Sequence, residues 1–305
     1  MKVVVTGAAG YIGWSVVNAL IDREAVTEVA VYDNFSRRNY GLLLTGKRPG
    51  YEKLSVNVDD ILNSRGLRTV FSGADCVCHL AALAPSPYSD DHPHSFDQVN
   101  HWGTAEVCYA TEDENVPRIV YVSSGAVYGF GDSPFDVSVD PMPATAYGTS
   151  KLAGERHVDR LSDSRDAVIL RAGTVYGLNP VARFDTFLNR FVLDAALGRP
   201  VQVHGSGEQS RPVIHVERLA DVITAAILGE VGTGRYDAVD ENATVNAAVD
   251  ALRSHTEKLE VIHMSQQERL RDLKMRPDTK IQSVSGTTHA VASELPQMLD
   301  QVALK

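Results

Sequence analysis

Apolar and polar positions follow two alternating periods along the first half of the chain. Short, continuous apolar runs of the kind found in parallel strands covered on both faces alternate with stretches whose apolar residues recur at helical spacing. These patterns predict strands over 2–5, 28–32, 54–58, 75–80, 116–123 and 166–171 and helices over 11–22, 64–71, 96–111 and 147–161. Strands alternating with helices through short loops predict an α/β fold with a doubly wound parallel sheet of the Rossmann type.

The second half of the chain is less regular. Helices are predicted over 185–197, 217–228 and 244–255, and a short strand over 201–204. We therefore expect a smaller α+β C-terminal lobe at the end of the sheet. The predicted division assigns 1–174, with 207–233 returning to it, to the sheet domain, and 175–206 and 234–305 to the lobe.

Composition and charge exclude several partner classes. The 305 residues carry a formal net charge of −10, which argues against nucleic acid as a partner because nucleic-acid-binding surfaces are basic. No apolar run reaches the length of a membrane span, and the first residues do not read as a signal peptide. The 3 cysteines are too few for a disulfide framework. These features predict a cytoplasmic protein that does not bind a membrane.

The first chemical motif is a glycine-rich turn between the first predicted strand and helix. Gly7, Gly10 and Gly13 are spaced three apart in the segment 6–13, TGAAGYIG. Glycines permit a tight turn and let backbone N–H groups approach a pyrophosphate, which the helix N-terminus also attracts. A close-packed strand–helix corner would have the same pattern, so the following acidic residues matter.

Carboxylates follow the second and third predicted strands. Asp33 ends the second strand, where it can accept hydrogen bonds from adenosine ribose hydroxyls and would repel a 2′-phosphate, which favours NAD over NADP. Arg37 and Arg38 follow closely and are suited to a phosphate, so NADP remains an alternative. Asp60, next to Ile61, is placed either to meet the adenine amino group or to cap a helix.

The second chemical motif can move a proton. Tyr147 and Lys151 lie one helical turn apart on the same predicted face, and Ser124 directly follows the fifth predicted strand. A free tyrosine is a poor base at neutral pH, but a nearby ammonium stabilises the phenolate and lowers the pKa. Tyr147 would then take a proton from a substrate hydroxyl while Ser124 orients that oxygen. The alternative is a surface pair with the lysine in solvent.

Together these motifs resemble the extended short-chain dehydrogenase/reductase superfamily, in its nucleotide-sugar epimerase/dehydratase branch (UDP-glucose 4-epimerase-like). The resemblance covers nearly the whole chain. It is carried by TGAAGYIG at 6–13, Asp33-Asn34, HLAA at 79–82, Val99-Asn100, SSGAVYG at 123–129, YGTSK at 147–151 and RPVIHV at 211–216.

The resemblance implies an NAD-dependent enzyme whose sheet domain holds NAD and whose lobe holds a nucleotide-diphosphate sugar. The implied NAD-binding residues are Gly7, Gly10, Tyr11, Ile12, Gly13, Asp33, Asn34, Asp60, Ile61, Leu80, Ala81, Ala82, Asn100, Ser123, Tyr147 and Lys151. Ser124, Tyr147 and Lys151 are the implied catalytic set, and Ser124, Tyr147, Thr174 and Arg211 the implied substrate contacts. The family also implies a homodimer built on the helices 96–111 and 147–161.

The residues after Ser124 favour one reaction of that branch. Its 4,6-dehydratases carry Asp-Glu at the next two positions and its decarboxylases carry a Glu at the second of them, whereas this chain has Gly125 and Ala126 there. This pattern resembles the 4-epimerases, which act through a transient 4-keto intermediate and regenerate the cofactor. A 4-ketoreductase or a dehydratase of the same family is the alternative. A non-enzymatic NAD-sensing protein is disfavoured because Tyr147 and Lys151 are both present.

Several positions depart from the family pattern. Gly173 and Thr174 replace a ring and an amide expected near the sugar phosphates, and Pro212 replaces an acid after Arg211. A second phosphate arginine is either Arg271 or Arg276. His79 ends a predicted strand, and His92 and His94 form a pair interrupted by a proline with no third ligand at metal-binding spacing, so no metal is predicted.

Overall fold

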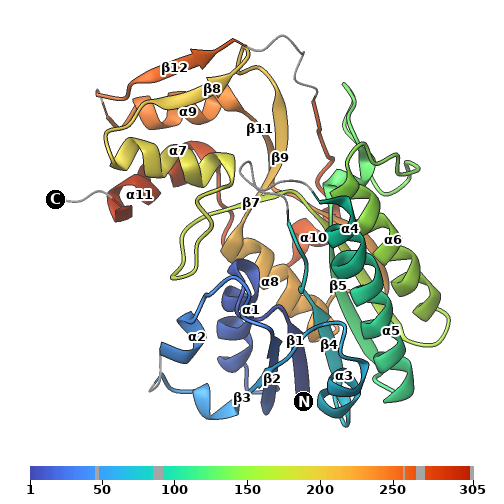
Figure 1. Cartoon of the computed structure of the whole chain (residues 1–305). Coiled ribbons are helices and arrows are strands. Elements are labelled where there is room, and N and C mark those ends of the chain that lie inside the picture. Colours follow the sequence, from blue (N-terminus) through green and yellow to red (C-terminus); the bar gives the residue numbers. More distant parts are fainter. Residues whose placement is uncertain (45–47, 85–91, 257, 266–271, 303–305) are drawn as a thin grey trace.

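A parallel seven-stranded sheet forms the centre of the larger domain (Figure 1). The computed structural model describes residues 1–44, 48–84, 92–256, 258–265 and 272–302. The sheet has the order β10-β6-β5-β4-β1-β2-β3, and the order reverses between β1 and β4. Its strands are β1 (Lys2–Thr6), β2 (Glu28–Asp33), β3 (Leu54–Val58), β4 (Cys76–His79), β5 (Arg118–Ser124), β6 (Asp166–Ala172) and β10 (Gly234–Ala238). The doubly wound fold predicted from the apolar runs is confirmed.

Helices cover both faces of this sheet because its strands are apolar on both sides. One face packs against α1 (Tyr11–Ile21) and α8 (Val216–Ile227). The other packs against α3 (Ser64–Phe71), α5 (Gly103–Asp113) and α6 (Ala146–Leu161). The short segments beside them are α2 (Gly41–Leu44), η1 (Tyr51–Lys53), α4 (Pro93–Phe96), η2 (Asp97–Trp102), η3 (Gly125–Tyr128) and α10 (Thr279–Ser283).

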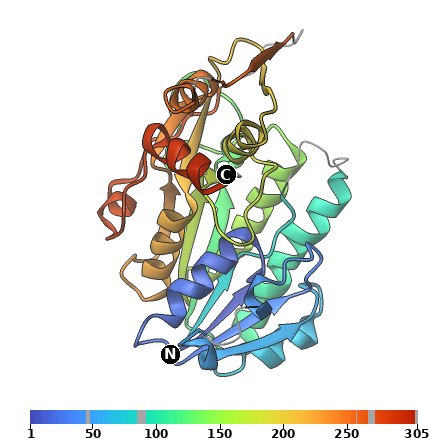
Figure 2. The ribbon, with the colours of Figure 1, turned by 90° about the vertical axis from the view of Figure 1, so that its left-hand side faces the viewer.

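A smaller lobe lies beyond the carboxyl ends of the strands (Figures 1 and 2). It contains the sheet β11-β9-β7, the strand pair β12-β8 and a separate apolar core. Its elements are β7 (Thr174–Tyr176), α7 (Phe187–Ala196), β8 (Val201–His204), β9 (Ser210–His215), β11 (Glu241–Thr244), α9 (Val245–Arg253), β12 (Val261–Met264) and α11 (Val291–Val302).

The chain returns to the large domain more often than the sequence indicates. The predicted boundary at 234 gives the next residues to the lobe, but β10 pairs in parallel with β6 in the large sheet. Further on, Arg218 of α8 donates to the carbonyl of Ile281 in α10 at 2.8 Å. Local periodicity does not reveal either return, because both depend on pairing between distant segments.

The helix predicted over 96–111 is interrupted. It is divided into α4, the π-helical η2 and α5. Asn100 in η2 is fully buried, and its side-chain amide bonds to the backbone N–H and carbonyl of Leu83 at 2.8 and 2.9 Å. The wide turn therefore directs a polar side chain inward to hold the loop after β4, a role that helical spacing does not indicate.

Candidate active site

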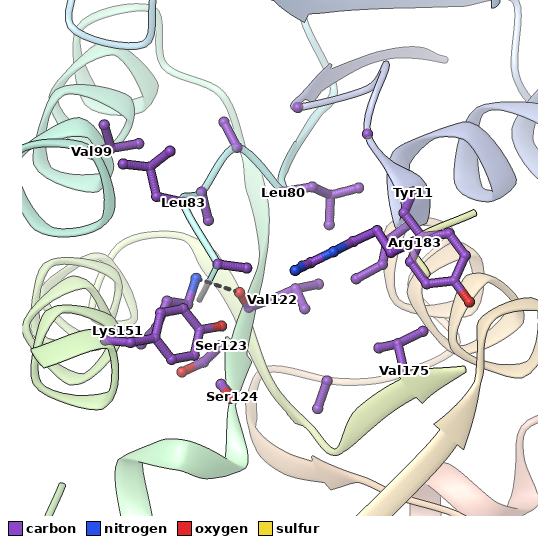
Figure 3. A pocket seen from close by; sticks show the side chains of 18 of the residues that line it. Tyr11, Leu80, Leu83, Val99, Val122, Ser123, Ser124, Lys151, Val175 and Arg183 are labelled. Carbon is purple, nitrogen blue, oxygen red and sulfur yellow. Dashed lines mark hydrogen bonds between the residues drawn. The ribbon is translucent and has the colours of Figure 1, made fainter. Parts of the chain in front are cut away.

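A cavity of about 590 Å³ lies at the carboxyl ends of the large sheet, between the two domains (Figure 3). In an open parallel sheet this is the expected ligand crevice, where the strand order reverses. All the predicted site residues except Asn100 line it. Asn100 lies behind the wall, where it holds Leu83, itself a lining residue.

The glycine turn forms one wall of the cavity. Gly7 has φ +70° and donates its N–H to the carbonyl of Tyr32 at 2.9 Å, which fixes the turn against β2. A Cβ on Gly7 would lie 2.7 Å from the Cα of Ala81, and a Cβ on Gly13 would lie 2.7 Å from the Cα of Ala8. Backbone therefore packs against backbone at the start of α1, whose first residues line the cavity and whose first N–H groups have no acceptor within the helix. This cradle fits the pyrophosphate of NAD.

Acidic groups mark the end of the cavity near β2 and β3. Both oxygens of Asp33 accept backbone N–H groups, from Ala9 at 2.9 Å and from Phe35 at 2.8 Å. Burial raises the pKa of Asp33, and these two hydrogen bonds oppose that rise. Asp60 accepts from the amide of Asn34 at 2.9 Å and from the N–H of Leu62 at 3.0 Å. Asp60 thus caps a local turn while also lining the cavity.

Ser124 and Tyr147 line the cavity from β5 and α6, whereas Asp33 lines it from β2. Ser124 ends β5, and its hydroxyl accepts from the N–H of Ala126 at 3.2 Å. Tyr147 lies in the first turn of α6, whose N-cap Thr145 accepts from Gly148 at 3.0 Å. Burial raises the pKa of Tyr147, against a hydrogen bond with Ser124 and the charge of Arg183. Strand end and helix start thus bring the two hydroxyl groups together.

Lys151 lies one turn further along α6 and is 3% exposed. Its Nζ donates to the carbonyl oxygen of Val122 at 2.7 Å, the dashed line in Figure 3. It also lies 4.2 Å from the centre of the Tyr121 ring. Burial lowers the pKa of Lys151 to about 7, against the charge of Glu155. The sequence predicts that Lys151 lowers the pKa of Tyr147, whereas in this structure the lowering groups are Ser124 and Arg183.

Arginines line the cavity from both domains. Arg211 of β9 donates to the carbonyl of Ser210 at 2.8 Å, and burial lowers its pKa. Arg183 and Arg37 also line the cavity, and Arg183 pairs with Asp185 at 2.8 Å. Figure 3 shows Arg183 entering from the side opposite Ser123, Ser124 and Lys151.

Sequence reasoning assigned no role to Arg183, since no motif marks the loop that carries it. Of the two candidates for a second phosphate arginine, Arg276 pairs with Asp136 at 2.5 Å, with its side chain 67% exposed. Arg271 lies outside the described residues.

One side-chain cluster away from the cavity has the composition of a metal site. The ligand atoms of His215, Glu217 and His289 lie within 4.8 Å of one another. The two imidazoles stack, with centroids 3.8 Å apart and 19° between their planes. A metal ion lies near the plane of each imidazole that binds it, and two nearly parallel rings share no such point. This arrangement suits ring stacking, and we assign no metal to it. Within the described segments, no helix is long and apolar enough to cross a membrane.

Comparison with known proteins identifies the class. The model of the NAD dependent epimerase/dehydratase family matches residues 3–238, so the chain belongs to this family and its cofactor is NAD. A Bacillus subtilis protein named as an uncharacterized UDP-glucose epimerase is 28% identical over 273 residues, which cover 87% of this chain and 85% of that protein.

Two further similar proteins have nucleotide sugars in their names. A UDP-glucuronate 4-epimerase of Thermodesulfobacterium geofontis is 30% identical over 71% of this chain and 68% of its own. The solved structure of MoeE5 in complex with UDP-glucose and NAD has a TM-score of 0.82 and 26% identity, covering 98% of each chain.

Proposed function

We propose that this enzyme inverts C4 of a nucleotide-diphosphate sugar through a transient 4-keto intermediate. One observation carries the proposal: Ser124 and Tyr147 share a single cavity with the glycine turn and with Arg211. A dinucleotide and a diphosphate sugar would therefore meet at the phenol. The relatives named as UDP-sugar epimerases support the same reaction.

Each side chain has a distinct part in this reaction. NAD held by the glycine turn and Asp33 would supply reversible hydride transfer at C4, and the 4-keto sugar would have to turn over in the cavity before hydride returns to its other face. Tyr147 takes the proton of the C4 hydroxyl and later gives it back, while Ser124 donates to the same oxygen. In this structure Ser124 and Arg183 lower the pKa of Tyr147, and we propose that the ammonium of Lys151, which lines the same cavity, adds to them by stabilising the phenolate. Because burial raises the pKa of Tyr147, the base step depends on these groups, and the phenol readily returns the proton.

Arg211 and Thr174 are proposed to hold the substrate diphosphate and sugar. Both line the cavity on the side of the smaller lobe. The guanidinium fork of Arg211 matches phosphate oxygens. At Gly173, a Cβ would lie 2.8 Å from the carbonyl oxygen of Pro212. Two of the three departures from the family pattern, Gly173 and Pro212, therefore lie side by side, and strand β9 closes the space that a side chain at 173 would occupy.

The distribution of carboxylates disfavours a dehydratase. Within the described part of the chain, the carboxylates that line the cavity are Asp33, Asp59 and Asp60, which come from the β2 and β3 side. None is placed beside Ser124 to assist the loss of water. A side chain at Gly125 would also overlap the sulfur of Met275.

A homodimer is proposed on α5 and α6. Trp102 and Tyr109 are 52% and 45% exposed, and the His101 ring stacks on Trp102 and on His157 of α6 with centroids 4.7 and 5.2 Å apart. Large exposed aromatic side chains on adjoining helices are characteristic of protein interfaces. A cytoplasmic location remains our proposal and is consistent with three free, buried cysteines.

Product analysis tests the reaction. The purified full chain is incubated with NAD and a panel of nucleotide-diphosphate hexoses, and products are analysed by mass spectrometry and NMR. We expect a product of unchanged mass with inverted C4. Loss of water would instead identify a dehydratase. Turnover of a 4-keto sugar only with added NADPH would identify a ketoreductase.

A substitution tests the role of the phenol. Tyr147→Phe should lower turnover by roughly 10²–10⁴-fold, the usual contribution of a general base, and leave NAD binding intact. Tyr109→Phe, at an exposed tyrosine on α5, is the control and should leave turnover unchanged. Substantial activity in Tyr147→Phe would exclude Tyr147 as the base.

A further inference from the structure

The structure places a second titratable side chain of α6 behind the proposed catalytic residues. Glu155 is fully buried and lies one helical turn after Lys151, on the same face of α6. Two consecutive residues of β5 receive the two side chains. Lys151 donates to the carbonyl of Val122, and the hydroxyl of Ser123 donates to Glu155 at 2.5 Å. Lys151 and Glu155 are thus each hydrogen-bonded to one of two adjacent residues of β5.

Two arginines complete the surroundings of Glu155. Arg171 of β6, 1% exposed, donates from Nε to one carboxylate oxygen at 3.0 Å and from Nη2 to the other at 2.7 Å. Arg235 of β10 lies 3.3 Å from the same carboxylate and also pairs with Asp159 at 2.5 Å. A buried bidentate pair of this kind fixes the position and orientation of the carboxylate.

We propose that Glu155 is a positioning residue for the reaction: its buried negative charge holds Lys151 in the ammonium form and its contact with Ser123 fixes the end of β5 beside the cavity. The inference rests on the proposed function, in which the charge of Lys151 supports the Tyr147 phenolate. Glu155 does not line the cavity and acts only through these neighbours.

The charge balance around Lys151 supports this role. Burial lowers the pKa of Lys151 to about 7, and Glu155 is the group whose charge raises it. The titratable and charged groups that face Lys151 and Glu155 from the packed elements are His79 of β4, Tyr121 of β5, Arg171 of β6, Arg235 of β10, and Tyr147 and Asp159 of α6. Of the two acids, Glu155 alone is buried, since the side chain of Asp159 is 47% exposed.

The test measures the charge of Lys151 directly. The full chain is labelled with acetic anhydride at a series of pH values, and the acetylation of Lys151 is read by peptide mass spectrometry. In Glu155→Gln the midpoint for Lys151 should fall by about one unit, the lower end of the shift caused by a close opposite charge. Asp159→Asn is the matched control on the next turn of α6 and should leave the midpoint unchanged. An unmoved midpoint in Glu155→Gln would overturn the proposal.

A second variant is needed in case Glu155→Gln does not fold, because that substitution leaves the buried charge of Arg171 without its partner. Glu155→Gln/Arg171→Met removes both charges and should show the same downward shift. The pH–rate profile then separates the two proposals. A fall of the alkaline limb by the same amount as the labelling midpoint supports both. A shifted midpoint with an unchanged profile would remove Lys151 from the reaction and overturn the positioning role with it. Equal loss of rate at every pH, without a midpoint shift, would overturn the proposal and show that Glu155 only stabilises the local structure.

Discussion

At Gly13, a single added methyl group should weaken cofactor binding while leaving the protein folded. A Cβ there would overlap the carbonyl oxygen of Gly7 and lie 2.7 Å from both the Cα and the carbonyl oxygen of Ala8. Ordinary contacts between carbon atoms are about 3.5–4.0 Å, so α1 must move by roughly 1 Å to accommodate Gly13→Ala. The obstructing atoms are all backbone, and no side chain can move aside to relieve the overlap.

Two energies oppose each other in this variant. Alanine favours a helix over glycine by about 1 kcal/mol, whereas overpacking costs about 1–3 kcal/mol. The net loss in unfolding free energy should therefore be small, at most about 2 kcal/mol. A shift of about 1 Å nevertheless takes N–H groups at the start of α1 out of hydrogen-bonding range of a pyrophosphate. Each such bond to a charged group contributes about 1.5–3 kcal/mol, so losing one raises the dissociation constant for NAD by roughly 10- to 100-fold.

Isothermal titration calorimetry with NAD and urea unfolding measure the two effects separately. Gly232→Ala is the control, because no heavy atom lies within 4 Å of the added Cβ. It should change neither quantity appreciably. An unchanged dissociation constant in a folded Gly13→Ala protein would refute the argument that this close approach positions the pyrophosphate.

Three further predictions concern stability, substrate binding and assembly. Burial lowers the pKa of Lys151 from 10.5 to about 7, so its cost to the native state is full at and below pH 7 and disappears as the pH rises toward 10.5. Lys151→Met should raise the unfolding free energy of the NAD-free protein by about 2 kcal/mol at pH 7 and by less at pH 9, and a loss of stability in urea at pH 7 would contradict this sign. Arg211→Gln should raise KM for the nucleotide sugar about 10- to 100-fold with little change in kcat, while the exposed Arg276→Gln should not, and equal effects in steady-state kinetics would exclude a specific phosphate contact. Trp102→Lys should convert a dimer to a monomer in sedimentation velocity, and an unaltered sedimentation coefficient would place any interface elsewhere.

Local sequence determined the parts of this protein that depend on neighbouring residues. Continuous apolar runs predict strands buried on both faces, as β1 and β5 are. The strand 54–58 and the helix 64–71 are confirmed at the same limits as β3 and α3, although β3, at the edge of the sheet, is partly exposed. The spacing of Gly7, Gly10 and Gly13 predicts a close backbone turn, and the steric contacts at Gly7 and Gly13 fit that prediction.

Only the tertiary structure decided what depends on segments far apart in the chain. Asn100 belongs to a motif associated with the cofactor, but a π-helical turn directs it to the loop at Leu83. Arg183 enters the cavity from a loop without a motif. The pKa of Lys151 depends on its burial and on Glu155, which spacing alone cannot reveal. The physical reason is that spacing fixes which residues share a face, whereas long-range packing fixes the solvent, charges and backbone that each face meets.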